Sequence, residues 1–131
     1  MPTYIAVVNQ DPGSAFGIHF PDVPGCFSAA DDLSSVPAMA QEALSLHLNG
    51  EPLPSARTLA SLKDDPDVRA DLAACAFLIA VPLVRLTGRT TRANITMDAG
   101  LLGAIDEVAK SRGLTRSAFL ADLARREIGM A

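Results

Sequence analysis

Short apolar stretches separated by turn residues open the chain. The second stretch keeps Phe16, Ile18 and Phe20 on one side, which is the spacing of a strand with one buried face. Asn, Asp, Pro, Gly and Ser residues separate the first two stretches, and a Pro-Asp-Val-Pro-Gly sequence forces a tight reversal before the third. The pattern therefore predicts three strands joined by turns, at residues 4–8, 15–20 and 26–30.

A helix and a fourth strand are predicted next. Pro37 suits the first turn of a helix, and Gly50 is placed to end it. One or two short helical segments broken at Pro66 are expected after this helix, and the six apolar residues at 76–81 predict a strand buried on both faces. The result is an α+β layer in which a helix packs on a sheet. The apolar stripe of the helix has the spacing i, i+3, i+4, i+7 and comprises Val36, Met39, Ala40, Ala43, Leu44 and His47.

A short polar stretch at 86–89 predicts a domain boundary, with one domain at 1–86 and a second at 87–131. Residues 92–97 then alternate strictly between polar and apolar, which is the period of a strand. Two helical patterns follow, separated by Gly113. The polar face of the predicted strand consists of Arg92, Asn94 and Thr96, and its apolar face consists of Ala93, Ile95 and Met97.

A lone strand with an apolar face is not stable in water, and the nearest partner is a second copy of the same chain. Pairing the two strands antiparallel would bury their apolar faces against four helices and leave a two-stranded ribbon outside. We therefore expect a homodimer whose core comprises Ala93, Ile95, Met97, Leu102, Ile105, Phe119 and Leu123.

Composition and charge refine this division. Hydrophobic residues make up 49% of the chain, so it can bury a core and is not a disordered protein. Residues 1–87 carry four basic side chains against ten acidic ones, whereas residues 88–131 carry seven basic against five acidic. The imbalance predicts a cationic partner for the first part and a polyanion for the second.

Two further features bear on location. The longest apolar run, at 73–84, is interrupted by Pro82 and is shorter than the roughly 20 residues of a membrane helix, and no signal sequence precedes the first strand. We therefore expect a cytoplasmic protein without a membrane partner. Cys26 and Cys75 stand apart from any paired motif, which favours buried reduced thiols over a zinc site.

The polar face of the predicted ribbon carries side chains suited to reading DNA bases. Arg92 can contact guanine in a bidentate manner, Asn94 can pair with adenine, and Thr96 can add a hydroxyl or methyl contact. The start of the last helix offers free amides for a phosphate, so phosphate contacts are expected from Thr115, Arg116 and Ser117. This segment resembles the ribbon-helix-helix repressors, which implies binding to operator DNA. The alternative is a solvent-exposed face in a module that only dimerises.

The first domain resembles a different family. The sequence Phe-Pro-Asp-Val-Pro-Gly-Cys at 20–26, Asp31, and Ala-x-Glu-Ala-Leu at 40–44 are similar to the signature of the HicB antitoxins. The resemblance implies a partial ribonuclease-H-like domain followed by a DNA-binding tail. It also implies a HicA-like toxin as partner, a small basic protein that cleaves messenger RNA, and repression of the toxin–antitoxin operon. Two dimers would pair along an operator with repeated half-sites, which leaves a tetramer open beside the dimer.

Enzymatic functions have less support. Two-metal nucleases place a carboxylate in the middle of the first strand, and residues 4–8 contain none. The acidic cluster at 64–67 lacks the glycine of a calcium loop and is interpreted as a helix start or part of the acidic surface. His19 and His47 have no catalytic partners in the sequence and are interpreted as structural. We therefore expect no enzyme, metal or cofactor. The alternative function is a stand-alone ribbon-helix-helix transcription regulator whose first domain senses a ligand.

Overall fold

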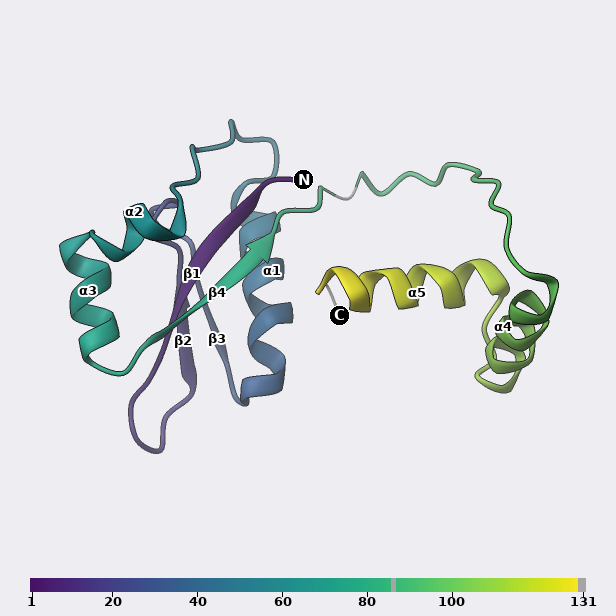
Figure 1. The fold of residues 1–131 in the computed structure, drawn as a ribbon, viewed down its shortest axis with the longest axis horizontal. Coiled ribbons are helices and arrows are strands. Elements are labelled where there is room, and N and C mark those ends of the chain that lie inside the picture. Colours follow the sequence, from purple (N-terminus) through teal and green to yellow (C-terminus); the bar gives the residue numbers. More distant parts are fainter. Residues whose placement is uncertain (86, 130–131) are drawn as a thin grey trace. The chain divides into compact units, whose positions relative to one another are not determined.

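The computed structural model describes residues 1–85 and 87–129. Leu86, at the predicted domain boundary, and residues 130–131, at the end of the predicted second domain, lie outside the described residues. The chain divides into two compact units, which we call unit 1 (Met1–Arg85) and unit 2 (residues 87–129). Figure 1 shows a mixed α+β arrangement in unit 1 and a pair of helices in unit 2. None of the described helices combines the length and the apolar character needed to cross a membrane.

A four-stranded antiparallel sheet with strand order β3-β2-β1-β4 forms the frame of unit 1. The hairpin between the first two strands turns at Gly13, which adopts a φ of 74°. The predicted reversal before the third strand consists of two consecutive turns, in which Val23 N–H donates to Phe20 O and Cys26 N–H donates to Val23 O, both at 3.1 Å. The three predicted N-terminal strands are thus confirmed. The strands are β1 (Thr3–Gln10), β2 (Phe16–His19), β3 (Phe27–Ala30) and β4 (Phe77–Pro82).

Helices cover both faces of this sheet (Figure 1). One face packs against α1, so that Tyr4, Ala6 and Val8 of β1 share a buried cluster with Ala40 and Leu44. Val7 points to the opposite face, where α3 contacts β1, and it is also fully buried. The predicted helix is confirmed as α1, and the predicted break at Pro66 separates two short helices. The helices of unit 1 are α1 (Val36–His47), α2 (Leu59–Lys63) and α3 (Pro66–Ala73), with a 3₁₀ turn, η1 (Leu33–Ser35), before α1.

One polar side chain is buried between α1 and β4. Gln41 is only 4% exposed, and its Nε2 donates to the carbonyl oxygen of Pro82 at 3.2 Å. The hydroxyl of Ser45 donates to Gln41 Oε1 at 3.3 Å, so the amide is satisfied on both sides. Gln41 therefore fastens the end of β4 to the helix at little desolvation cost.

Three expectations for unit 1 are wrong. The fourth strand is not buried on both faces, because β4 lies at the edge of the sheet and leaves Phe77 and Ala80 exposed. Cys26 is buried, and this burial raises the pKa of its thiol, but Cys75 is exposed. Cys75 lies in the turn after α3 with a φ of 70°. His47 is exposed at the last position of α1, because the helix ends where it leaves the sheet.

Unit 2 consists of α4 (Ala99–Ser111) and α5 (Arg116–Ile128), which pack on each other. Asp98 caps α4 by accepting the Leu101 N–H at 3.0 Å. Gly113 ends the helix in the left-handed conformation, at a φ of 68°, and Leu114 N–H returns to Ala109 O at 2.9 Å. Both predicted helices are therefore confirmed, with Gly113 between them as predicted.

The predicted strand at 92–97 differs from the structure. Within the described residues of the single chain, these six residues form no ladder with any strand. The physical reason follows from the sequence pattern itself, since the chain holds only one copy of the segment and a strand needs a partner for its N–H and C=O groups. The small core of unit 2 consists of Ile105, Ala109 and Phe119, with Met97 and Leu120 packed against them.

Candidate functional site

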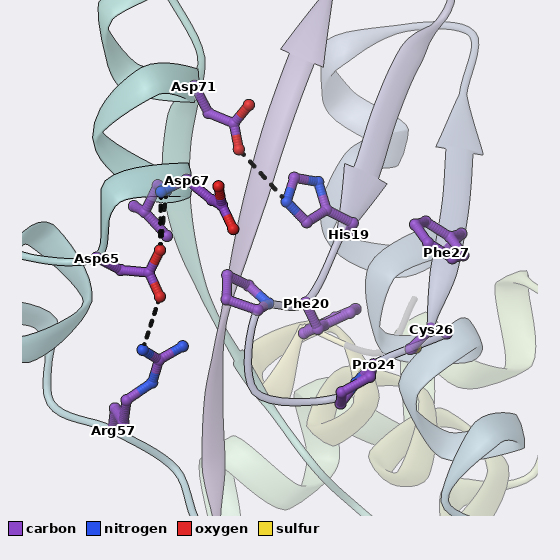
Figure 2. A pocket seen from close by; sticks show the side chains of 12 residues that line it. His19, Phe20, Pro24, Cys26, Phe27, Arg57, Asp65, Asp67 and Asp71 are labelled. Atoms are coloured by element: carbon purple, nitrogen blue, oxygen red, sulfur yellow. Dashed lines mark hydrogen bonds and ion pairs between the residues drawn. The ribbon is translucent and has the colours of Figure 1, made fainter.

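A pocket of about 330 Å³ opens between β2, the turn that follows it, and α3. Figure 2 shows the side chains that reach it from each element: His19 from β2, Phe27 from β3, Arg57 from the segment before α2, and carboxylates from α3. Residues 20–26, which carry the HicB resemblance, contribute Phe20, Pro24 and Cys26 to the lining. The pocket therefore joins the recognised sequence motif to the acidic residues of α3.

Arg57 holds one wall of this pocket in place. Its Nε and backbone N–H both donate to the carboxylate of Asp22, the latter at 2.7 Å, and its Nη1 donates to Asp65 Oδ2 at 2.9 Å. Asp65 also caps α3 by accepting the Asp67 N–H at 2.9 Å. The hydrogen bond from Arg57, followed by the bond from the Asp67 amide, holds the pKa of Asp65 below its ordinary value. The guanidinium of Arg57 thus connects the turn at residues 20–26 to the start of α3.

Two further carboxylates leave the pocket with excess negative charge. Asp71 Oδ2 lies 3.5 Å from His19 Nε2 (Figure 2). The carboxylate of Asp67 accepts no hydrogen bond and forms no ion pair with any described residue. Phe27, which lines the same pocket from β3, is 72% exposed. Carboxylates and an accessible aromatic residue that line one pocket form a site for an arginine or lysine side chain.

Two of the carboxylates around this pocket are already engaged by Arg57. Among the described residues, no group of three or more His, Cys, Asp or Glu side chains is arranged to hold a metal ion. Asp22 and Asp65 direct their oxygens at Arg57 instead of at a common point. The arrangement is suited to binding a cationic protein surface.

The predicted base-reading residues lie on an accessible segment of unit 2. Arg92, Asn94 and Thr96 are all exposed, and so is the backbone that carries them. Ile95 on the opposite side is 63% exposed, which is unusual for a β-branched residue of an alternating segment. Ala93 and Ile95, which were predicted to be buried in a dimer, are therefore uncovered in the single chain.

The predicted phosphate-binding residues lie together at the start of α5, where their roles are partly internal. Thr115 uses its hydroxyl oxygen to cap α5, accepting the Ala118 N–H at 3.1 Å. The guanidinium of Arg116 makes a bidentate pair with Asp106, with N–O distances of 2.8 and 2.7 Å. This pair holds the pKa of Asp106 below its ordinary value. Ser117 is exposed, whereas the Ala118 amide of the first turn is already used by the Thr115 cap.

The predicted dimer-core residues fall into two groups. Ile105 and Phe119 are buried, and Met97 and Leu102 are half-buried. The others are exposed, among them Leu123 at 40%. A hollow of about 750 Å³ separates residues 90–95 from the first half of α5, and Ile95 and Leu120 are among the apolar side chains that line it. The hollow thus leaves space for part of another polypeptide chain between residues 90–95 and α5.

The sequence identifies only part of the pocket lining, His19 and residues 20–26. Asp67 was interpreted only as part of a helix start or acidic surface, and Arg57, Phe27 and Asp71 were not named. The available signal was the excess of ten acidic over four basic side chains in residues 1–87. That excess indicates an acidic surface but does not show which carboxylates share it, because Asp71 and His19 come from elements 52 residues apart in the chain.

Known proteins resemble the chain over nearly its whole length. A profile of the family described as the HicB-like antitoxin of bacterial toxin-antitoxin systems matches residues 4–124. An uncharacterized 14.9 kDa protein from the rep-hol intergenic region of Haemophilus phage HP1 is 34% identical over 134 residues, covering 97% of this chain and 96% of the phage protein.

Solved structures give the same relationship. The antitoxin HicB of Burkholderia pseudomallei matches with a TM-score of 0.56 and 28% identity, over 95% of this chain and 96% of that one. A chain of the HicA3 and HicB3 toxin-antitoxin complex matches with a TM-score of 0.52 and 26% identity, over 63% of this chain and 99% of its own length. The family profile spans both units, and the folds agree with it. The chain therefore belongs to the HicB-like antitoxins of bacterial toxin-antitoxin systems.

Proposed function

We propose that this antitoxin binds and neutralises a HicA-like toxin through unit 1, and that it represses its own operon through a dimer of unit 2. The observation that carries the proposal is the likeness to the HicA3 and HicB3 complex, which covers 63% of this chain. Unit 1 holds a similar share, 85 of 131 residues. The strand and helix order of unit 1 supports a partial ribonuclease-H-like fold for the toxin-binding domain.

The acidic pocket is the proposed toxin-facing surface. Arg57 is already paired with Asp22 and Asp65, so Asp67 and Asp71 supply the charge left for a partner. A basic toxin would place an arginine or lysine against these acids and the exposed ring of Phe27. Carboxylates that gain a partner only on binding attract a basic toxin during its approach, and they fix its orientation once it is in contact.

The toxin-binding proposal can be tested by removing this charge. The double variant Asp67→Asn, Asp71→Asn should weaken co-purification with the product of a neighbouring basic reading frame and reduce rescue from its toxicity. The matched control is Asp11→Asn with Glu42→Gln, which removes the same charge from the β1–β2 turn and from α1. Equal loss in both double variants would show that only overall charge matters, and no loss in either would exclude the pocket as the interface.

For unit 2 we propose a ribbon-helix-helix dimer in which residues 92–97 of two chains pair. The strict alternation of this segment, the 63% exposure of Ile95 and the hollow beside α5 support it. The ribbon would present Arg92, Asn94 and Thr96 to the major groove. Phosphates would meet Thr115, Arg116 and Ser117 at the start of α5.

The operator proposal has a direct test. Arg92→Ala should weaken binding to the operator about 10- to 100-fold, the loss of one bidentate base contact of roughly 1–3 kcal/mol, while leaving toxin neutralisation intact. Arg125→Ala removes a charge from an exposed position of α5 and is the matched control, with an expected loss well below tenfold. A gel-shift titration at fixed salt compares them, and sequence-specific binding by Arg92→Ala at the wild-type level would refute the ribbon assignment.

A further inference from the structure

The segment between α1 and α2 is held by side chains instead of by its own backbone. Residues 52–58 belong to no helix or strand. None of residues 52–57 shares a backbone-to-backbone hydrogen bond with another described residue, and two of them are prolines, which have no N–H to donate. Side-chain contacts must therefore fix the path of this segment across unit 1.

Side chains hold this segment at its start, its middle and its end. Arg85 Nη2 donates to Glu51 O at 2.7 Å, just before the segment begins. The hydroxyl of Tyr4 donates to Pro54 O, also at 2.7 Å. Arg57 holds the end of the segment. The first two contacts fix only the segment itself, whereas the contacts of Arg57 join it to both walls of the acidic pocket.

The two partners of Arg57 lie on opposite walls of the pocket. Asp22, in the turn after β2, accepts from Arg57 with both carboxylate oxygens, and its side chain is only 6% exposed. Asp65 accepts from Arg57 with Oδ2, while its Oδ1 accepts the N–H groups of Asp67 and Val68 at the start of α3. The guanidinium therefore sets the spacing between the turn at residues 20–26 and the first turn of α3.

The acids proposed to face the toxin depend on this spacing. Asp67 and Asp71 belong to α3, whereas Phe27 reaches the pocket from β3 (Figure 2). Without Arg57, the carboxylate of Asp22 would stay buried without a partner, which is unfavourable. The turn would have to move until water reached this carboxylate, and α3 would lose its connection to the turn.

We infer, on the basis of the proposed toxin-binding function, that Arg57 is a positioning residue: its two ion pairs hold the turn at residues 20–26 and α3 at the spacing that the toxin recognises. A purely electrostatic role would have the opposite consequence. Arg57 is a cation within an acidic surface, so its removal would increase the attraction to a basic toxin. Positioning predicts that its removal weakens binding.

Arg57→Gln in the full-length protein distinguishes the two roles. The matched control is Arg69→Gln, which removes the same charge from an exposed position of α3 outside the pocket lining. Surface plasmon resonance with the product of the neighbouring basic reading frame measures both rates. Arg57→Gln should dissociate about tenfold faster than Arg69→Gln, with no slower association, because the charge change is equal and only the fit differs. Equal dissociation rates would overturn the inference.

Asp22→Asn identifies the contact through which Arg57 acts. Charge alone would give Asp22→Asn and Arg57→Gln opposite effects on toxin affinity, and these effects would cancel in the double variant. Positioning predicts that both weaken binding and that the double variant binds no more weakly than Arg57→Gln, because one contact is lost in each case. Arg57→Lys keeps the charge but not the planar fork, so it should recover only part of the affinity. Cancellation in the double variant would contradict positioning.

The two cysteines report on the turn without any toxin. Cys26 ends the turn and is buried, and this burial raises the pKa of its thiol, whereas Cys75 is exposed. An aromatic disulfide reagent should therefore modify Cys75 first in every variant. Arg57→Gln should speed the modification of Cys26 about tenfold, since the loss of a charge-assisted hydrogen bond favours opening of the turn. A Cys26 rate equal to that of Arg69→Gln would overturn the inference, and circular dichroism verifies that each variant is folded.

Failure of the pocket as the toxin interface gives a different result. In that case the double variant Asp67→Asn, Asp71→Asn binds the toxin at wild-type strength, and the inference falls with the proposed interface. If this double variant binds weakly while Arg57→Gln dissociates like Arg69→Gln, the interface stands and the positioning role of Arg57 is wrong. Weak binding by both, with a wild-type dissociation rate for Arg69→Gln, is the expected result.

Discussion

Unit 1 and unit 2 differ in how completely a single chain buries their apolar side chains. Unit 1 covers its sheet with helices on both faces, so that Tyr4, Val7 and Leu44 are almost completely buried within one chain. Unit 2 buries only Ile105, Ala109 and Phe119 among its described residues and leaves Ile95 and Leu101 more than half exposed. It follows that the first unit can be stable as a single chain, whereas the proposed ribbon dimer would complete the core of the second.

The largest expected effect lies in the core of unit 1. Leu44→Ala should lower the free energy of unfolding by about 2–5 kcal/mol, because it leaves a cavity beside β1 that the sheet cannot fill. Urea denaturation followed by circular dichroism measures this loss. Because one chain supplies the whole core of unit 1, the loss should be the same at low and high protein concentration. A loss that depends on concentration would contradict the view that unit 1 is complete within one chain.

The next effect concerns the exposed face of unit 2. Ile95→Ala should remove about 1.5–3 kcal/mol of burial per chain from the dimer, which raises its dissociation constant by roughly two orders of magnitude or more. Leu46→Ala is the matched control, since Leu46 is 69% exposed on α1 and no partner is proposed for it. Sedimentation equilibrium over a dilution series should separate the two variants. Equal dissociation constants would mean that Ile95 faces solvent in the assembled protein as well.

The smallest effect is the acid sensitivity of the ion pairs around Arg57. Hydrogen bonds from Arg57 and the Asp67 amide lower the pKa of Asp65, so the folded state favours the charged carboxylate. This contribution is present above about pH 4, the pKa of an unfolded aspartate, and is lost as the pH falls through the lower folded pKa. The pair is partly exposed, so the effect should be small.

Arg57→Gln should therefore lower the Tm at pH 6, and its difference from the wild type should shrink as the pH falls towards about 2. The substitution leaves the other charged and titratable side chains of the pocket, Asp67, Asp71 and His19, unchanged, so the variant isolates the contribution of Arg57. Arg69→Gln on the exposed surface of α3 is the control and should show no such trend. A constant difference in Tm across this range would contradict the assigned pKa shift.

Much of the fold could be predicted from the sequence because local signals were strong. Turn residues around Gly13 and Gly25 marked the first three strands, and periodic apolar positions marked α1, α4 and α5. Thr115 and Gly113 gave the boundaries between the last two helices, since capping and left-handed termination depend on neighbouring residues alone. The HicB resemblance is likewise confirmed by the family match.

Other features depend on contacts that the sequence does not reveal. The edge position of β4 results from the strand order, and Cys75 is exposed because the turn after α3 points it outward. The pocket brings His19 to Asp71 and Arg57 to Asp22 across long sequence separations. The predicted strand at 92–97 is a further case, since its partner would belong to a different molecule.

The central claim is that residues 92–97 become a strand only when two chains meet. Hydrogen exchange of their backbone amides, measured over a range of protein concentrations, tests it most directly. Slow exchange is expected at concentrations above the dimer dissociation constant and fast exchange below it, while amides of β1 stay protected throughout. Fast exchange of residues 92–97 at every concentration, with β1 still protected, would contradict the claim.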